Sequence, residues 1–175
     1  MIELHSPSPE VTRSIAAAVA QLARPGDLIV LAGQMGAGKT AFAQGFARAL
    51  GIHEPVTSPT YTLVRTYQAG TVTLHHADLY RLDHTTEVDD LALAELLEDD
   101  AIMLVEWGDV VDLGDHLQIE LRLADVSDHD PEHNPEHNPE LDPMQRRDIT
   151  ITSSDRRWAP RWERLEAALD EWVLQ

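Results

Sequence analysis

The apolar positions near the start of the chain follow the period of an amphipathic helix. They recur at spacings close to 3.6 residues, at Val11, Ile15, Val19 and Leu22. Ser8-Pro9 before them is typical of a helix start, and Pro25-Gly26 after them is typical of a helix end. The next run, residues 28–32, is wholly apolar. It predicts a strand buried on both faces, as in a parallel sheet.

The remaining patterns continue this alternation of helices and strands. We expect a hairpin of residues 61–67 and 71–77, a short helix at 91–97, a second buried strand at 102–105, and a second hairpin of 117–123 and 149–151. His75 and His76 are adjacent in the first hairpin and so point to opposite faces, and we expect one to be packed and the other to face water. Apolar residues at the C-terminus predict a helix packed on the sheet, and a partner surface is the alternative. Its apolar face is made of Trp158, Trp162, Leu165, Leu169 and Trp172.

The composition of the 175 residues is that of a single folded domain without cysteine chemistry. Hydrophobic residues make up 43%, and the absence of cysteine excludes disulfides, thiol catalysis, iron–sulfur clusters and cysteine-bound zinc. Asp and Glu total 31 against 13 Lys and Arg, so the formal net charge is -18 and tight binding to bare nucleic acid is not expected. The sequence shows neither a signal peptide nor an apolar run of about 20 residues. We therefore expect a cytoplasmic protein with no membrane association.

Residues 127–145 interrupt this pattern with a four-residue repeat. Pro131, Pro135 and Pro139 recur at the interval that His129, His133 and His137 also follow. The histidines would form a metal-binding stripe on a helix, but prolines at this spacing forbid one. We expect a disordered insertion in a domain that otherwise spans residues 1–175.

The strongest chemical signal is the segment after the first buried strand. Gly33-Gln34-Met35-Gly36-Ala37-Gly38-Lys39-Thr40 fits the Walker A pattern, and a predicted helix at 41–50 follows it. The glycines let backbone N–H groups turn toward phosphate oxygens, and the helix N-terminus adds positive potential. Lys39, the only lysine of the chain, would reach the β- and γ-phosphates, and the Thr40 hydroxyl would bind Mg²⁺. A glycine-rich turn with an unrelated lysine is disfavoured by this strand–loop–helix context.

A phosphate-binding loop also needs an acid that holds the metal ion, usually at the end of a neighbouring strand. Glu106 follows the apolar run at 102–105, and Asp78 follows the run at 71–77. Either carboxylate would lie near the phosphates if its strand lies beside the loop strand, and each would otherwise be a solvated acid. Most loops of this kind use Asp at this position, so Glu106 departs from the general pattern. An Asn-Lys-x-Asp guanine-reading segment is impossible because Lys39 is the only lysine, which favours ATP over GTP.

Four blocks of sequence together resemble the TsaE family, also called YjeE, of bacterial P-loop proteins that act in the synthesis of threonylcarbamoyladenosine in tRNA. The blocks are the Walker A segment, Thr57-Ser58-Pro59-Thr60-Tyr61-Thr62-Leu63, His76-Ala77-Asp78-Leu79-Tyr80-Arg81-Leu82 and Val105-Glu106-Trp107. The resemblance implies an α/β P-loop NTPase fold with a mixed central sheet flanked by helices. It implies a Mg²⁺-dependent ATPase that is weak alone and stimulated by partner proteins.

The resemblance also assigns roles to individual residues. It implies Thr40, Glu106 and Asp78 as metal-binding residues, with Lys39, Asp78 and Glu106 as catalytic residues. Thr60 corresponds to a nucleotide-sensing loop, and Trp107 lies beside the site. The implied nucleotide-binding set is Gly33, Gly36, Ala37, Gly38, Lys39, Thr40, Ala41, Thr60, Trp107 and Arg147. The implied partner is the TsaB–TsaD heterodimer, with tRNA engaged only through that complex.

Three other functions fit parts of the sequence. A small-molecule or nucleotide kinase shares the phosphate-binding loop but needs an arginine-rich lid over the phosphates. The main arginine cluster lies near the C-terminus, where Arg156, Arg157, Arg161 and Arg164 are expected to form intramolecular ion pairs. A nucleotide-gated adaptor without catalysis would not need Glu106, and a direct RNA-binding protein is disfavoured by the net charge.

Overall fold

The structure is a computed structural model that describes residues 1–82, 92–97, 101–124 and 146–174. The repeat at 127–145 lies outside the described residues, so the expectation of disorder there stays a prediction. In the described ranges, no helix has the length and apolar character needed to cross a membrane.

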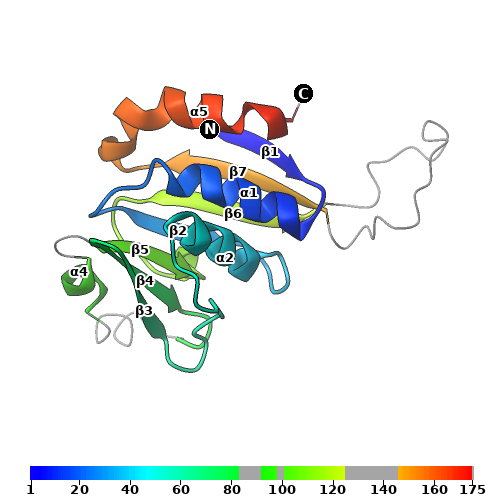
Figure 1. Cartoon of the computed structure of the whole chain (residues 1–175). Helices are drawn as coiled ribbons and strands as arrows, with labels where there is room; N and C mark the ends of the chain where they lie inside the picture. Colours follow the sequence, from blue (N-terminus) through cyan, green and yellow to red (C-terminus); the bar gives the residue numbers. More distant parts are fainter. Residues whose placement is uncertain (83–91, 98–100, 125–145, 175) are drawn as a thin grey trace.

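A seven-stranded mixed sheet forms the centre of the described structure (Figure 1). Its strands are β1 (Ile2–Ser6), β2 (Leu28–Ala32), β3 (Val64–Ala69), β4 (Val72–Asp78), β5 (Ala101–Glu106), β6 (Leu117–Leu123) and β7 (Arg147–Ser153). They lie in the order β1-β7-β6-β2-β5-β4-β3. Both predicted hairpins are present, since β3 pairs with β4 and β6 pairs with β7 in antiparallel fashion. The sequence patterns did not predict β1, which pairs with β7 at the opposite end of the chain.

The centre of the sheet is parallel, as the two wholly apolar runs predicted. Strand β2 pairs in parallel with both β5 and β6, and β5 pairs in parallel with β4. All residues of β2 and β5 are buried. Because parallel strands share a direction, the carboxyl ends of β2, β4 and β5 meet at one edge of the sheet. That edge brings together the glycine loop, Asp78 and Glu106.

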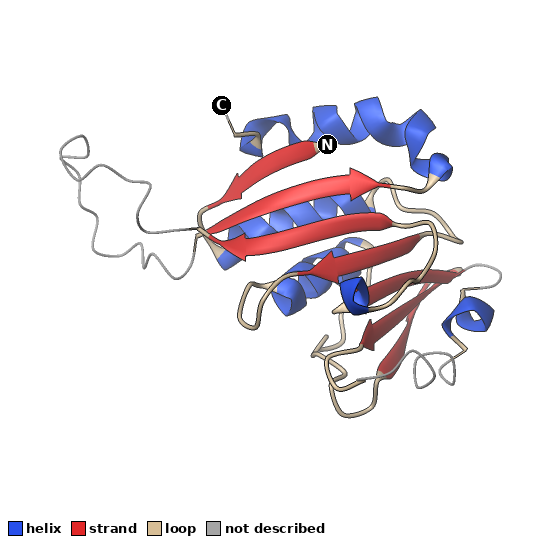
Figure 2. Cartoon of the chain, turned by 180° about the vertical axis from the view of Figure 1, so that it is seen from behind, coloured by secondary structure: helices blue, strands red, loops and turns tan. Residues whose placement is uncertain are grey.

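Alternate residues of β2 enter two different cores. Ile29 and Leu31 join the larger cluster beneath α1 (Pro9–Ala20) and α2 (Lys39–Ala49), and these two helices cover one face of the sheet (Figure 1). Leu28 and Val30 join a smaller cluster on the other face, near α4 (Leu93–Leu96) and the short helix η1 (Gly108–Val110) (Figure 2). This two-sided burial is the physical reason for the unbroken apolar run.

The C-terminal segment closes the larger core. It runs as η4 (Arg156–Arg161), α5 (Trp162–Leu169) and η5 (Asp170–Trp172) rather than as the single helix that the apolar spacing predicts. Pro160 lies inside η4 and withholds a backbone donor there. Trp158 is fully buried, and Trp162 and Trp172 pack partly buried against the same core.

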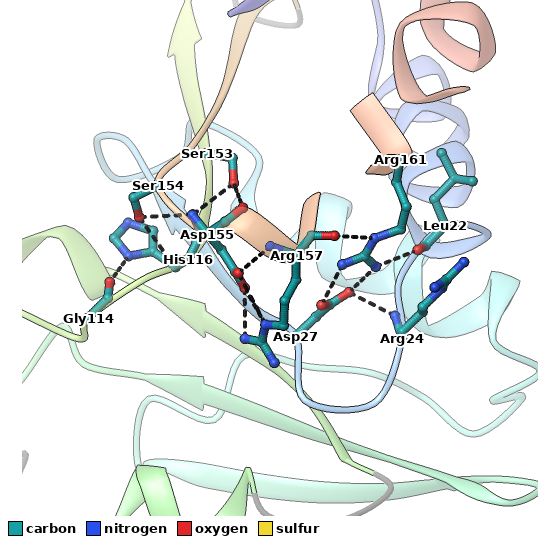
Figure 3. Close-up of polar contacts among 10 residues, drawn as sticks. All are labelled: Leu22, Arg24, Asp27, Gly114, His116, Ser153, Ser154, Asp155, Arg157 and Arg161. Atoms are coloured by element: carbon teal, nitrogen blue, oxygen red, sulfur yellow. Dashed lines mark hydrogen bonds and ion pairs between the residues drawn. The ribbon is translucent and has the colours of Figure 1, made fainter. Parts of the chain in front are cut away.

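Two arginines of this segment form ion pairs near the start of β2, and one of them joins the segment to that strand (Figure 3). Arg161 donates to both carboxylate oxygens of Asp27, at 2.6 and 2.9 Å, and Arg157 pairs with Asp155 at 2.7 Å. For these two arginines the expected intramolecular pairing is confirmed. The Arg161–Asp27 pair joins residues that lie 134 positions apart in the chain, whereas Arg157 and Asp155 are two positions apart.

The expectation that one of the two adjacent histidines faces water is wrong. His75 is 8% exposed and His76 is 0% exposed, because packed structure covers both faces of β4. The Nδ1 atom of His75 lies 2.9 Å from the Thr66 hydroxyl, and burial lowers the pKa of His75. His76 points toward Glu106 instead.

Candidate nucleotide-binding site

The glycine loop connects the end of β2 directly to the start of α2. Gly33 and Gly38 have φ angles of 129° and 107°, which L side chains rarely adopt. A Cβ atom on Gly33 would also collide with the Leu121 carbonyl of β6. The tight loop leaves the N-terminal end of α2 facing the carboxyl edge of the sheet, which is the arrangement that binds phosphate.

Lys39 begins α2 and is 5% exposed. Its Nζ donates to the carbonyls of Gly33, at 2.5 Å, and Gln34, at 3.0 Å, and lies 3.7 Å from the centre of the Trp107 ring. Burial lowers its pKa, and the charges of Glu106, Asp109 and Asp78 offset part of that effect. The ammonium group is therefore held at the loop by backbone oxygens and an aromatic face.

Trp107 holds its ring over Lys39 by means of an unusual backbone conformation. Its φ of 62° is left-handed, which is rare for a bulky residue. Its N–H donates to the Leu31 carbonyl at 2.9 Å, which anchors the residue to the end of β2. The Tyr80 ring packs against the Trp107 ring with centroids 5.0 Å apart. Strain of this kind is typical of functional sites.

The two candidate acids lie side by side. Asp78 ends β4 and Glu106 ends β5, and the two residues are register partners in the parallel pair. They are 2% and 3% exposed. The Thr40 hydroxyl donates to the Glu106 carboxylate, at 3.2 Å from Oε1 and 3.3 Å from Oε2. The contact places a hydroxyl and a carboxylate where one metal ion can meet both.

Asp78 is engaged by the loop that precedes β3. Its Oδ2 accepts hydrogen bonds from Ser58, at 2.5 Å, and Thr60, at 2.7 Å, while its Oδ1 accepts from the Tyr80 N–H at 2.9 Å. Ser58 was not among the predicted site residues, although it stands in the same sequence block as Thr60. Its hydroxyl contacts Asp78 only because the loop folds across the end of β4.

These residues surround a cleft of about 470 Å³ at the carboxyl edge of the sheet. The predicted site residues that line it are Gly36, Gly38, Lys39, Thr40, Thr60, Asp78, Glu106 and Trp107. Gly33 and Ala37 belong to the loop behind this lining, and Ala41 lies in the first turn of α2. Tyr61, Tyr80 and Arg81 also line the cleft and were not predicted as site residues.

Arg147 lies behind the loop rather than in the lining of the cleft. It begins β7 and is 8% exposed. Its Nε donates to the Ala37 carbonyl at 3.1 Å, and its Nη2 donates to the Gly36 carbonyl at 3.4 Å. These contacts brace the outer side of the phosphate-binding loop.

The oxygen donors of the cleft suit Mg²⁺. They include the Thr40 hydroxyl and the carboxylates of Glu106 and Asp78. Within the ranges that the structure describes, no group of three or more His, Cys, Asp or Glu side chains could hold a metal ion without other ligands. Magnesium in nucleotide sites is bound by one or two protein oxygens together with phosphates and water, so this donor set fits it.

Comparison with known proteins places this arrangement in a family. A family model described as "Threonylcarbamoyl adenosine biosynthesis protein TsaE" matches residues 6–132, which is more than half of the chain. The chain belongs to the TsaE family. This TsaE-family protein is 43% identical over 120 residues to the tRNA threonylcarbamoyladenosine biosynthesis protein TsaE of Bacillus subtilis, which covers 67% of this chain and 75% of the relative.

Two further comparisons cover more of the chain. The protein of the same name from Streptomyces coelicolor is 33% identical over 155 residues, covering 84% of this chain and 93% of the relative. The crystal structure of Bacillus subtilis YdiB matches with a TM-score of 0.72 and 31% identity, covering 95% of this chain and 97% of that one. The P-loop NTPase fold that the sequence of this TsaE-family protein predicted is confirmed, with its mixed sheet flanked by helices. Arg147 lies beyond the range that the family model matches.

Proposed function

We propose that the chain binds Mg²⁺ and ATP in this cleft, hydrolyses ATP slowly, and acts through TsaB–TsaD in forming the threonylcarbamoyl group on adenosine in tRNA. The observation that carries the proposal is the convergence of Lys39, Thr40, Asp78 and Glu106 on one cleft. Three strand ends supply these residues, and only a parallel arrangement brings them together. The family description and the names of the relatives support the pathway.

Phosphate binding requires the ammonium group of Lys39 to exchange its hydrogen-bond partners. Its Nζ is bound to the carbonyls of Gly33 and Gln34, and a phosphate oxygen carries more negative charge than either. The ammonium group therefore turns from the loop carbonyls to the β- and γ-phosphates, while the loop N–H groups bind the α- and β-phosphates. Trp107 lies against the moving group, so its fluorescence should report the exchange.

Thr40, Glu106 and Asp78 would hold the magnesium ion that accompanies the nucleotide. Bound there, Mg²⁺ would neutralise charge on the β- and γ-phosphate oxygens. Thr40 offers an oxygen lone pair to the ion while its hydroxyl hydrogen stays directed at Glu106. Asp78 lies one strand further from the loop, where its carboxylate would orient the attacking water.

The hydrogen bonds at Asp78 support slow turnover by the chain alone. The oxygen Oδ2, which would accept from water, already accepts from Ser58 and Thr60. Orientation of water requires these hydroxyls to move away or to share the carboxylate. A partner that repositions the loop containing Ser58 and Thr60 would therefore raise the rate, which is the behaviour we assign to TsaB–TsaD.

The charge of the chain supports indirect action on tRNA, and we assign that action to the cytoplasm. With a formal net charge of -18, the protein repels the phosphate backbone at long range. We assign tRNA binding and transfer of the threonylcarbamoyl group to the partner complex. ATP turnover by this protein resets that complex. Modification of tRNA by this protein alone, with ATP and threonylcarbamoyl adenylate, would contradict this division of labour.

The kinase alternative finds no support in the described arginines near the C-terminus. A kinase lid needs arginines above the phosphates. Arg157 and Arg161 are instead paired with Asp155 and Asp27 near the start of β2 (Figure 3). The phosphate-binding loop follows the other end of that strand, so the two sites are separated by its full length.

The decisive test is ATP hydrolysis by the purified protein in Mg²⁺, measured with and without TsaB–TsaD. We expect slow release of phosphate by the chain alone and faster release with the heterodimer. Lys39→Ala is the control, because it removes the charge that binds phosphate but leaves the fold of the sheet. A chain that binds no magnesium nucleotide in calorimetry would refute the proposal. A phosphorylated small-molecule acceptor in an ATP screen would favour the kinase.

A further inference from the structure

A buried histidine contacts the metal-binding acid from the neighbouring strand. His76 lies in β4 and is 0% exposed, and its Nε2 is 2.9 Å from Oε1 of Glu106 in β5. The contact joins residues 30 positions apart and crosses the parallel pair that also carries Asp78. Neither phosphate binding nor the orientation of water, as derived above, uses this histidine.

The direction of this hydrogen bond follows from the chemistry of the two groups. A carboxylate only accepts hydrogen bonds, so the Nε2 atom of His76 carries the hydrogen and donates it to Glu106. The other ring nitrogen, Nδ1, is buried and has no hydrogen-bond partner among the described residues. An apolar side chain would fill the same space without leaving an acceptor unpaired. Packing alone therefore does not account for a histidine here.

Glu106 needs such a partner more than the usual aspartate would. Glutamate has an additional side-chain torsion, and its terminal torsion is broad, so its carboxylate is less firmly directed by the backbone. Within the described ranges, two side chains donate to this carboxylate, Thr40 from α2 and His76 from β4. Oε1 accepts from both donors, whereas Oε2 accepts only from Thr40. The histidine thus engages Oε1 and leaves Oε2 with the Thr40 hydroxyl as its one side-chain donor among the described residues.

We propose that His76 is the positioning residue of Glu106: its Nε2–H holds Oε1 so that the carboxylate presents its other oxygen to the magnesium ion of the nucleotide complex. The inference rests on the proposed function of the cleft as a magnesium–nucleotide site. Partners that orient metal ligands in this way typically contribute about ten- to a hundredfold to metal affinity. His76 itself touches neither nucleotide nor metal.

The test separates metal-dependent from metal-independent nucleotide binding. ATP affinity is measured by calorimetry in EDTA and across a Mg²⁺ titration, for the wild type, His76→Leu and His76→Gln. We expect His76→Leu to leave the affinity for ATP in EDTA unchanged. The Mg²⁺ concentration that gives half of the full increase in ATP affinity should rise by about ten- to a hundredfold. His76→Gln should restore most of the loss, because its amide nitrogen can donate from nearly the position of Nε2.

The adjacent histidine provides a matched control. His75 is also buried in β4, but it points to the opposite face and contacts Thr66. His75→Leu should therefore leave the Mg²⁺ dependence of ATP binding unchanged. In a Glu106→Gln background, His76→Leu should add no further shift, since the group that it positions has been altered.

Three results would overturn the inference. The first is an unchanged Mg²⁺ dependence of ATP binding in His76→Leu. The second is a loss of ATP affinity in His76→Leu that is equal in EDTA and in Mg²⁺. The third is a shift in Mg²⁺ dependence in His75→Leu as large as that in His76→Leu. If His76→Leu does not fold, His76→Asn replaces it, because asparagine is too short to reach Glu106. His76→Asn should therefore show the weakened Mg²⁺ dependence of ATP binding that His76→Gln largely restores. Failure of the wild type to bind magnesium nucleotide would instead refute the proposed function, so the two outcomes are distinguishable.

Discussion

Removal of the Arg161 side chain should destabilise the protein more than any other single arginine substitution in the C-terminal segment. Arg161 and Asp27 are 4% and 1% exposed, so the Arg161→Met variant would leave a buried carboxylate without its cation. The variant would also lose the hydrogen bond to the Leu22 carbonyl, at 2.8 Å, and the contact with the Trp158 ring, at 4.1 Å. Breaking one side of a buried ion pair typically costs about 3–5 kcal/mol.

The expected loss is large enough to measure by thermal or urea unfolding. For a chain of this size, 1 kcal/mol corresponds to about 2–4 °C in Tm, so Arg161→Met should lower the Tm by roughly 6–20 °C. Arg157→Met is the comparison: its partner Asp155 is also buried, at 4% exposed, but Arg157 is 51% exposed and water screens the pair, so its loss should cost clearly less than the loss of Arg161. Below the unfolding transition, ATP affinity should be unchanged in both variants, because the pair lies at the far end of β2.

A double variant tests the origin of the loss. Asp27→Asn combined with Arg161→Met removes both charges, so it should be clearly more stable than the sum of the two single losses predicts. A loss below about 1 kcal/mol in Arg161→Met would refute the reasoning. Additivity of the two substitutions to within about 0.5 kcal/mol would refute it as well, because residues in direct contact should couple.

Three further predictions concern the cleft and the acid stability of the fold. Lys39→Ala should abolish ATP binding in calorimetry, because no other lysine can supply the phosphate counter-charge, and retained binding would contradict its role. Asp78→Ala should bind ATP but lose turnover in a phosphate-release assay; unchanged hydrolysis would show that Asp78 does not orient water. Burial opposes a charged Asp155, but hydrogen bonds from Arg157 outweigh it and leave the pKa of Asp155 lowered. The contact therefore stabilises the fold above the ordinary Asp pKa of about 3.9 and is lost as pH falls below it, so Asp155→Asn should weaken the acid dependence of unfolding.

Short-range patterns in the sequence were sufficient to predict the phosphate-binding loop and the central strands. A strand, a glycine-rich turn and a helix follow one another directly at residues 28–49, so their pattern depends on neighbours in the chain rather than on distant contacts. The wholly apolar runs of β2 and β5 correctly predicted strands that are buried on both faces of the sheet. Side chains on either face of these strands enter a hydrophobic core. The motif blocks were also sufficient for the family, which the comparisons confirm.

Only the tertiary structure decided which residues meet across the sheet. Periodicity reports that a side chain is buried but not which strand lies beside it, so the pairing of β1 with β7 and the contact of His76 with Glu106 were missed. The place of Arg147 behind the loop likewise depends on the position of β7 in the sheet. These contacts join distant parts of the chain, and strand order, which no local pattern encodes, brings them within hydrogen-bonding distance.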